Sequence, residues 1–99
     1  NPAEYFQNSW GVFSGKPVDV EVIFTGKAAR VVSMSRHHRS EKVTNLDDGT
    51  VRYEVTVSGT EEICRWLMGF GGDAVVVKPL SLISEIQKRA DSILKNYQS

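Results

Sequence analysis

Residues 42–58, KVTNLDDGTVRYEVTVS, hold the pattern on which the predicted fold depends. Over Thr50–Ser58, apolar and polar side chains alternate, which is the period of a strand with one buried face. Asp48 and Gly49 form a dipeptide favoured in two-residue hairpin turns, because both positions tolerate a positive φ. The stretch therefore predicts an antiparallel hairpin that joins Lys42–Asp47 to Thr50–Ser58. Its apolar face carries Val51, Tyr53, Val55 and Val57.

Two elements and a loop precede the hairpin. Val18–Phe24 alternates in the same way and predicts another half-buried strand. Gly26 breaks that pattern, and Lys27–Ser33 carries apolar residues at helical spacing, so we expect a short helix there. The apolar residues of this helix are Ala28, Val31 and Val32. Ser35–Glu41 is polar and predicts a loop that leads into the hairpin.

A helix and a strand follow the hairpin. Thr60 is placed to cap the helix, and Gly71-Gly72 ends it with a residue that tolerates the left-handed conformation. The predicted core stripe of this helix is Ile63, Trp66, Leu67 and Phe70. Ala74–Val77 is apolar throughout and predicts a short strand, which Pro79 ends.

The last predicted helix runs from about Leu80 to Tyr97. Its apolar face consists of Ile83, Ile86, Ala90, Ile93, Leu94 and Tyr97. The complete order is strand, helix, strand, strand, helix, strand, helix. Right-handed crossovers and short loops then predict an α+β fold, a ferredoxin-like βαββαβ sheet with an additional C-terminal helix.

In this topology the first and third strands are central, and the other two are edges. The polar sequence of Lys42–Asp47 suits a solvated edge. The three valines of the other edge, Val75, Val76 and Val77, do not suit one. We therefore expect that edge and the last helix to contact a second subunit or a neighbouring domain.

Composition favours one soluble domain without strong affinity for nucleic acid. The chain has 99 residues, and its 12 basic and 12 acidic side chains give a formal net charge of zero. No apolar run approaches the ~20 residues that span a bilayer, and no signal-peptide pattern opens the chain. A single cysteine, Cys64, favours a reducing, cytoplasmic location. The chain begins with Asn1 instead of methionine, so we expect a fragment.

No motif predicts an enzyme, a metal or a cofactor. Gly69–Ala74 matches G-x-G-x-x-A, but a helix precedes it and a strand follows, the reverse of the dinucleotide-binding context. His37 and His38 are adjacent in a loop, whereas a structural zinc site needs about four ligands. Cys64 lies beside a core stripe, so we expect a buried or half-buried thiol.

Charges on the polar face of the sheet have two interpretations. Asp19 and Glu21 belong to the first predicted strand, and Arg52 and Glu54 to its neighbour. Cross-strand charge pairing explains them, and the alternative is a ligand contact on an open sheet face. This face carries no aromatic side chains on which RNA bases could stack.

The only local basic run, Arg36–Lys42, also has two interpretations. It is either a solvated loop or a site for a small anion or an oligonucleotide. The candidate contacts are Arg36, His38, Arg39, Ser40 and Lys42. The first fifteen residues hold four aromatic side chains, which we expect to dock on this domain or on a preceding one. They are Tyr5, Phe6, Trp10 and Phe13.

Several segments together resemble the C-terminal extension (WCX) domain of WYL-domain bacterial transcriptional regulators. Tyr5–Phe13 is similar to the family's linker out of the WYL barrel, and His38–Lys42 resembles its H-x-S-Q-x element with Glu41 in place of glutamine. Asp48-Gly49 matches the hairpin, and Arg65–Gly71 matches an R-W-x-x-G/S-F-G helix ending. The resemblance implies a linker over residues 1–15 and the extension domain over residues 16–99.

The resemblance also implies a role. Such regulators bind DNA through an N-terminal winged helix and sense an effector in the barrel, and their extension supports dimerisation and inter-domain signalling. We therefore expect the parent domains and a homodimer as partners, DNA binding outside this fragment, and an effector that the sequence does not identify. The glutamate at position 41 puts in doubt any ligand contact that glutamine would make, because an ionised carboxylate only accepts hydrogen bonds.

Overall fold

The computed structural model describes residues 16–98, so the four aromatic residues predicted to dock, Tyr5, Phe6, Trp10 and Phe13, lie outside the described residues. The elements in chain order are β1 (Pro17–Phe24), α2 (Gly26–Met34), β2 (Lys42–Asn45), β3 (Val51–Ser58), α3 (Glu61–Met68), a 3-10 turn η2 (Gly71–Asp73), β4 (Ala74–Lys78) and α4 (Leu80–Lys95).

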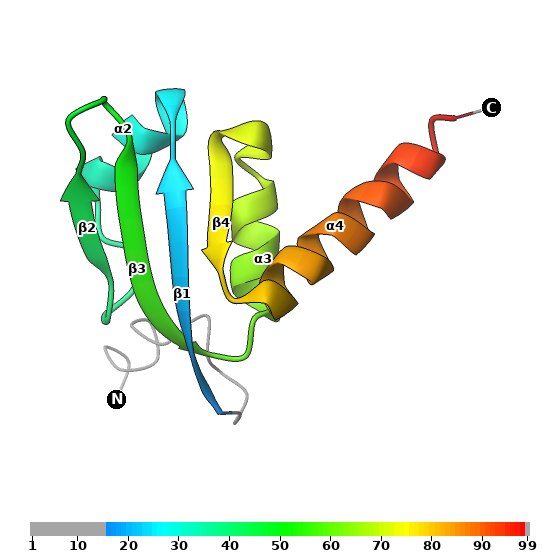
Figure 1. Ribbon diagram of the computed structural model, residues 1–99, viewed down its shortest axis with the longest axis horizontal. Coiled ribbons are helices and arrows are strands. Elements are labelled where there is room, and N and C mark those ends of the chain that lie inside the picture. The colour runs from blue at the N-terminus through cyan, green and yellow to red at the C-terminus, as the bar shows by residue number, and fades with distance from the viewer. Residues whose placement is uncertain (1–15, 99) are drawn as a thin grey trace.

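The strands form one antiparallel sheet in the order β2-β3-β1-β4 (Figure 1). The predicted central pair and both predicted edges are confirmed. Val22 lies opposite Tyr53 on β3 and opposite Val76 on β4. Helices α2 and α3 cover one face of the sheet (Figure 1). The fold is α+β and ferredoxin-like, with α4 as an additional C-terminal helix.

The core lies between the sheet and these two helices, and Phe24 is at its centre. The ring of Phe24 has edge contacts with Tyr53, Trp66 and Phe70, at centroid distances of 5.7, 5.8 and 5.3 Å. Tyr53 is fully buried, whereas Trp66 and Phe70 are partly buried against the core. The other buried residues are Val20, Val22, Ala28, Ala29, Val32, Val51, Val55, Val57, Ile63, Cys64, Leu67 and Leu82.

Two predicted helix faces need correction. In α2, Ala29 is buried, whereas Val31 is 47% exposed. Residues 28, 29 and 32 point to one side of a helix with 3.6 residues per turn, and residue 31 points about 100° away from that side. In α4, Leu82 is buried although the predicted stripe omitted it.

The hairpin turn also differs from the predicted two-residue form. Strand β2 ends at Asn45. Within the turn, from Leu46 to Thr50, only Gly49 has a positive φ, of 85°. The Leu46 N–H donates to the Thr50 carbonyl at 2.9 Å, and the Gly49 N–H donates to the Leu46 carbonyl at 3.2 Å. This is a three-residue loop with a left-handed glycine, which needs no positive φ at Asp48.

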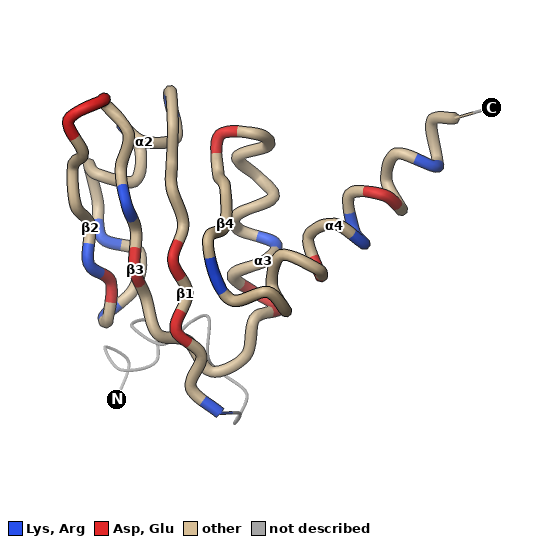
Figure 2. The backbone as a smooth tube through the Cα atoms, viewed as in Figure 1, with Lys and Arg blue, Asp and Glu red and all other residues tan. Residues whose placement is uncertain are grey.

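The polar face of the sheet lacks the predicted cross-strand pairing. Glu21 lies directly opposite Glu54, a like-charge pair, and Arg52 lies opposite Ile23. Lysines on the outer strands lie opposite these two glutamates instead. Lys42 of β2 lies opposite Glu54, and Lys78 of β4 lies opposite Glu21. Figure 2 shows these charges spread over all four strands. The prediction was wrong because it fixed the face of each charge without the register between strands.

Helix α4 starts at the end of β4 and projects away from the sheet (Figure 1). Its first turns pack on the domain, where Leu82 is fully buried and Ile86 partly buried. The second half is exposed, and the exposed fractions of Ile93, Leu94 and Tyr97 are 52, 54 and 85%. None of the helices within residues 16–98 has the length and apolar character that crossing a lipid bilayer requires.

Candidate functional site

The Arg36–Lys42 loop is organised around the carboxylate of Glu41. One oxygen, Oε1, accepts hydrogen bonds from the backbone N–H groups of His37 and His38 at 2.7 and 2.8 Å. The Tyr53 hydroxyl donates to the same oxygen at 3.0 Å. Glu41 therefore fixes the loop to the central strand β3.

The tyrosine in this arrangement remains a hydrogen-bond donor. Burial raises the pKa of Tyr53 far above its usual value, and the neighbouring charge and hydrogen bond of Glu41 raise it further. The hydroxyl thus stays protonated throughout the physiological pH range.

On the other side of the loop, the His37 ring lies 5.1 Å from the Trp66 ring.

A second set of contacts fixes the loop through Ser40. Its hydroxyl donates to the Thr56 carbonyl and accepts from the Thr56 N–H, both at 3.0 Å. The Ser40 N–H donates to Nδ1 of His38, which is buried. Burial lowers the pKa of His38, although the charge of Glu41 acts in the opposite direction. His38 and Ser40 are therefore engaged in building the loop.

The remaining predicted ligand contacts, Arg36, Arg39 and Lys42, are exposed. Next to them, a cavity of about 370 Å³ lies where α2 ends. The residues that line it are Val32, Ser33, Met34, Ser35, Arg36, Glu41 and Val43. Of the predicted contacts, only Arg36 lines this cavity. From the sequence alone, Glu41 could be recognised only as a departure from a motif, without a structural role.

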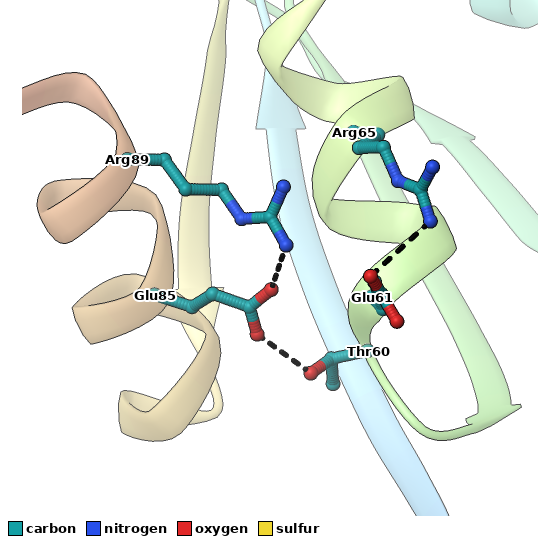
Figure 3. Close-up of polar contacts among 5 residues, drawn as sticks. All are labelled: Thr60, Glu61, Arg65, Glu85 and Arg89. Atoms are coloured by element: carbon teal, nitrogen blue, oxygen red, sulfur yellow. Dashed lines mark hydrogen bonds and ion pairs between the residues drawn. The ribbon is translucent and has the colours of Figure 1, made fainter. Parts of the chain in front are cut away.

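A polar cluster joins the start of α3 to α4 (Figure 3). The Thr60 hydroxyl donates to one oxygen of Glu85 at 3.1 Å, and the other oxygen lies 3.1 Å from Arg89. Thr60 precedes α3 as predicted, yet its side chain makes no capping hydrogen bond. That prediction is corrected: the backbone of Thr60, with φ −115° and ψ −1°, is not in the extended conformation of a capping residue, and its hydroxyl donates to Glu85. The spacing of Glu85 and Arg89, four residues apart, was a signal for their ion pair that the sequence analysis missed.

Two chemical candidates from the sequence have structural roles. Cys64 is fully buried, and burial followed by the charge of Glu85 raises the pKa of its thiol, which disfavours the nucleophilic thiolate. In the glycine-rich segment, Gly71 has a φ of 62° just beyond the end of α3, and β4 follows after η2. The order of elements is the reverse of a dinucleotide-binding turn.

The divergence of α4 from α3 leaves two cavities that share Met68. One, of about 170 Å³, is mainly apolar and is lined by Leu67, Met68, Gly71, Ala74, Ile86 and Ala90. The other, of about 380 Å³, is lined by Arg65, Met68, Arg89, Ser92 and Ile93. Both lie between α3 and α4, and we refer to the two cavities together as the α3–α4 groove.

The predicted interface valines of β4 divide between two faces. Val75 and Val77 are 55 and 47% exposed, and Val75 lies opposite Ile23 on the face of the sheet that α2 and α3 leave open. Val76 lies opposite Val22 and packs against the core.

Comparison with known families gives one result for this chain. Residues 16–94 match the family model described as WCX domain. No curated protein matches the chain.

Proposed function

Because this chain belongs to the WCX domain family, we propose that it is the C-terminal regulatory and oligomerisation domain of a WYL-type, winged-helix transcriptional regulator. WCX domains are regulatory domains and not a known family of enzymes. In the proposed role, the domain pairs with a second copy and transmits a signal between the domains of the parent protein.

The unsupported half of α4 is the observation that carries the proposed pairing. Ile86 and Ala90 line the α3–α4 groove, and the same helix face continues to Ile93, Leu94 and Tyr97, which are 52, 54 and 85% exposed. A short helix is only marginally stable in water without tertiary packing. An exposed apolar surface of this kind marks an interaction site.

A second copy of the chain supplies a matching occupant for the groove. The groove offers apolar walls, and the distal half of α4 offers apolar side chains. If each α4 inserted into the groove of the other copy, the contact would be isologous and closed by a two-fold axis. Arg65 and Arg89 line the outer part of the groove, and each is paired with a glutamate four residues before it.

The open face of β4 adds to the apolar surface near α4. Val75 is exposed there opposite Ile23, which is half-buried, and Val77 is exposed where the register between β4 and β1 shifts. In contrast, most of that face carries charged side chains of both signs, which would lose their contact with water if the face were buried against another copy. We therefore assign the pairing of two copies to α4 and the groove, and we expect the valines to contact the parent barrel.

The test is the molar mass of the full-length regulator in solution, measured by light scattering. We expect a variant with both Ile93→Glu and Leu94→Glu to stay folded and fall from dimer to monomer. Lys88→Glu is the matched control, because Lys88 lies on the opposite side of α4. A double variant that kept the dimer mass would remove the role proposed for α4. If charged substitutions at Val75 and Val77 left inter-domain signalling unchanged, the role proposed for these two valines would be wrong.

Ligand sensing by the Arg36–Lys42 loop is a second candidate function. The supporting observation is that Glu41 and Ser40 hold the loop in one conformation while Arg36, Arg39 and Lys42 remain exposed. A fixed loop that presents cations is suited to an anionic group. Titration of phosphate and short oligonucleotides, followed by NMR, tests this, and no shifts at the three cations would exclude it.

A further inference from the structure

The C-terminal end of α2 differs from the ends of α3 and α4. At the end of α3, the Gly69 N–H donates to the Arg65 and Trp66 carbonyls, and at the end of α4, the Asn96 N–H donates to the Ile93 carbonyl. Beyond α2, the chain leaves in an extended conformation at Ser35, with φ −149° and ψ 159°. Within residues 16–98, no backbone N–H beyond α2 donates to its last carbonyls, and its last turn has no basic residue.

Uncapped carbonyls give a helix end a partial negative charge. At α2 this charge faces a cavity, since Val32, Ser33 and Met34 line the space of about 370 Å³ described above. A volume of this size is within the range of small-molecule sites, about 300–1,000 Å³.

Glu41 lines the same cavity and carries a full negative charge. Its Oε1 is occupied by the His37 and His38 amides and by the Tyr53 hydroxyl. Its other oxygen, Oε2, accepts no hydrogen bond from residues 16–98, so it is free to receive a donor from a ligand. The helix end and this oxygen both favour a cation.

Arg36 places a positive charge on the wall of the same cavity. The described part of the chain contains no ion pair between Arg36 and Glu41 or any other carboxylate. The two opposite charges thus line one cavity without a direct ion pair between them.

We propose that this cavity binds a small zwitterion, a molecule of the amino-acid class. Its ammonium group contacts Glu41 Oε2 and the last carbonyls of α2, and its carboxylate pairs with the Arg36 guanidinium. The proposal rests on the sensing role given above and deepens it by naming the ligand class. The proposal also explains a glutamate at position 41. A glutamine there would keep an acceptor for the same three donors but would lose the charge that selects an ammonium group.

The experiment uses the complete 99-residue chain and three probes of similar size, followed by ¹⁵N NMR. The probes are γ-aminobutyrate, which carries both charges, butylammonium, which carries only the positive one, and butyrate, which carries only the negative one. We expect saturable shifts at Ser35–His38 with γ-aminobutyrate, weaker ones with butylammonium and none with butyrate. If γ-aminobutyrate caused no saturable shifts, or if butyrate bound equally well, the proposal would be wrong.

Two variants and one control identify the contacts. Glu41→Gln keeps the hydrogen bonds of the loop, and we expect it to bind γ-aminobutyrate roughly tenfold more weakly, as for loss of a charge-assisted hydrogen bond. Arg36→Gln, on a side chain that makes no internal ion pair, should lose the preference for γ-aminobutyrate over butylammonium. Arg30→Gln is the control, because Arg30 is exposed on α2 but neither lines the cavity nor belongs to the Arg36–Lys42 loop. Unchanged affinity in both variants would overturn the assignment.

Failure of the sensing role is distinguishable from failure of the site. If the chain bound γ-aminobutyrate as expected but the ligand changed neither operator binding nor the mass of the full-length regulator, the site would stand and the sensing role would fall. If no binding occurred while oligonucleotides shifted Arg36, Arg39 and Lys42, the sensing role would stand and the zwitterion site would fall.

Discussion

Replacing Tyr53 by phenylalanine removes one oxygen atom from the contact that holds the loop to the sheet. The ring stays buried and keeps its edge contact with Phe24, so the change removes the hydrogen bond to Glu41 while leaving the ring in place. A hydrogen bond to a charged group contributes about 1.5–3 kcal/mol. Glu41 is only half-buried and retains its two amide donors, so water can replace the hydroxyl in part. We therefore expect the free energy of unfolding to fall by about 1.5 kcal/mol, the lower end of that range.

The measurement is urea denaturation of the 99-residue chain by circular dichroism. A slope of about 1–3 kcal/mol per molar urea converts this loss into a midpoint lower by roughly 1 M. The slope itself should not change, because the buried surface is the same. Tyr97→Phe is the matched control, since Tyr97 is 85% exposed and should give no shift. A Tyr53→Phe midpoint equal to that of the wild type would refute the view that Glu41 fixes the loop through this hydroxyl.

Three further predictions follow from burial. Above pH 10.0, the usual pKa of tyrosine, the unfolded state releases a proton that folded Tyr53 retains, so stability should fall by up to about 1.4 kcal/mol per pH unit; denaturation at several alkaline pH values should show a shallower fall in Tyr53→Phe, and equal slopes would contradict the raised pKa. Leu82→Ala should cost about 2–5 kcal/mol in urea melts, because Leu82 is fully buried and anchors α4; a loss below that range would mean that α4 is held by its polar contacts alone. Trp66→Ala should cost about 3–5 kcal/mol, since its ring contacts Phe24 at 5.8 Å and Phe70 at 5.2 Å, and a loss under 1 kcal/mol in the same assay would show that this helix face is not part of the core.

The fold could be predicted because its strands and helices have clear and different periods. The alternation in Val18–Phe24 and Thr50–Ser58 defined two strands with one buried face, and both lie at the centre of the sheet. The order of the elements and right-handed crossovers then made β2 and β4 the edges, although the valines of β4 do not suit a solvated edge. Periodicity states which face of an element is apolar, and here that information was enough for the topology.

Details that depend on partners distant in sequence could not be predicted in this way. Whether Glu21 meets a lysine or a glutamate depends on the register between strands, which one-residue differences change. The Thr60 hydroxyl has an intrinsic preference for capping, but its backbone is not in the extended conformation that capping requires, and the hydroxyl donates to Glu85, 25 residues later. The Asp48-Gly49 dipeptide is compatible with more than one turn, because a left-handed glycine also suits a three-residue loop.

The candidate site was only partly accessible to sequence reasoning. The loop and its exposed cations could be located from composition, because a short basic run stands out in a chain of zero net charge. The role of Glu41 depends on Tyr53, twelve residues away on another strand, and a polar contact of that kind leaves no periodic pattern. The cavity depends on how α2 ends, which is a property of backbone conformation at Ser35.

The paired hydrogen bonds between Ser40 and Thr56 have a consequence for aggregation. Strand β2 covers β3 only between Val51 and Glu54, so the backbone of Thr56 lies past the end of its neighbour. An open backbone edge is a template onto which a strand of another molecule can add. The Ser40 hydroxyl hydrogen-bonds both backbone polar groups of Thr56, the N–H and the carbonyl, and blocks that addition. A single side chain thus closes the sheet where its edge strand is too short to do so.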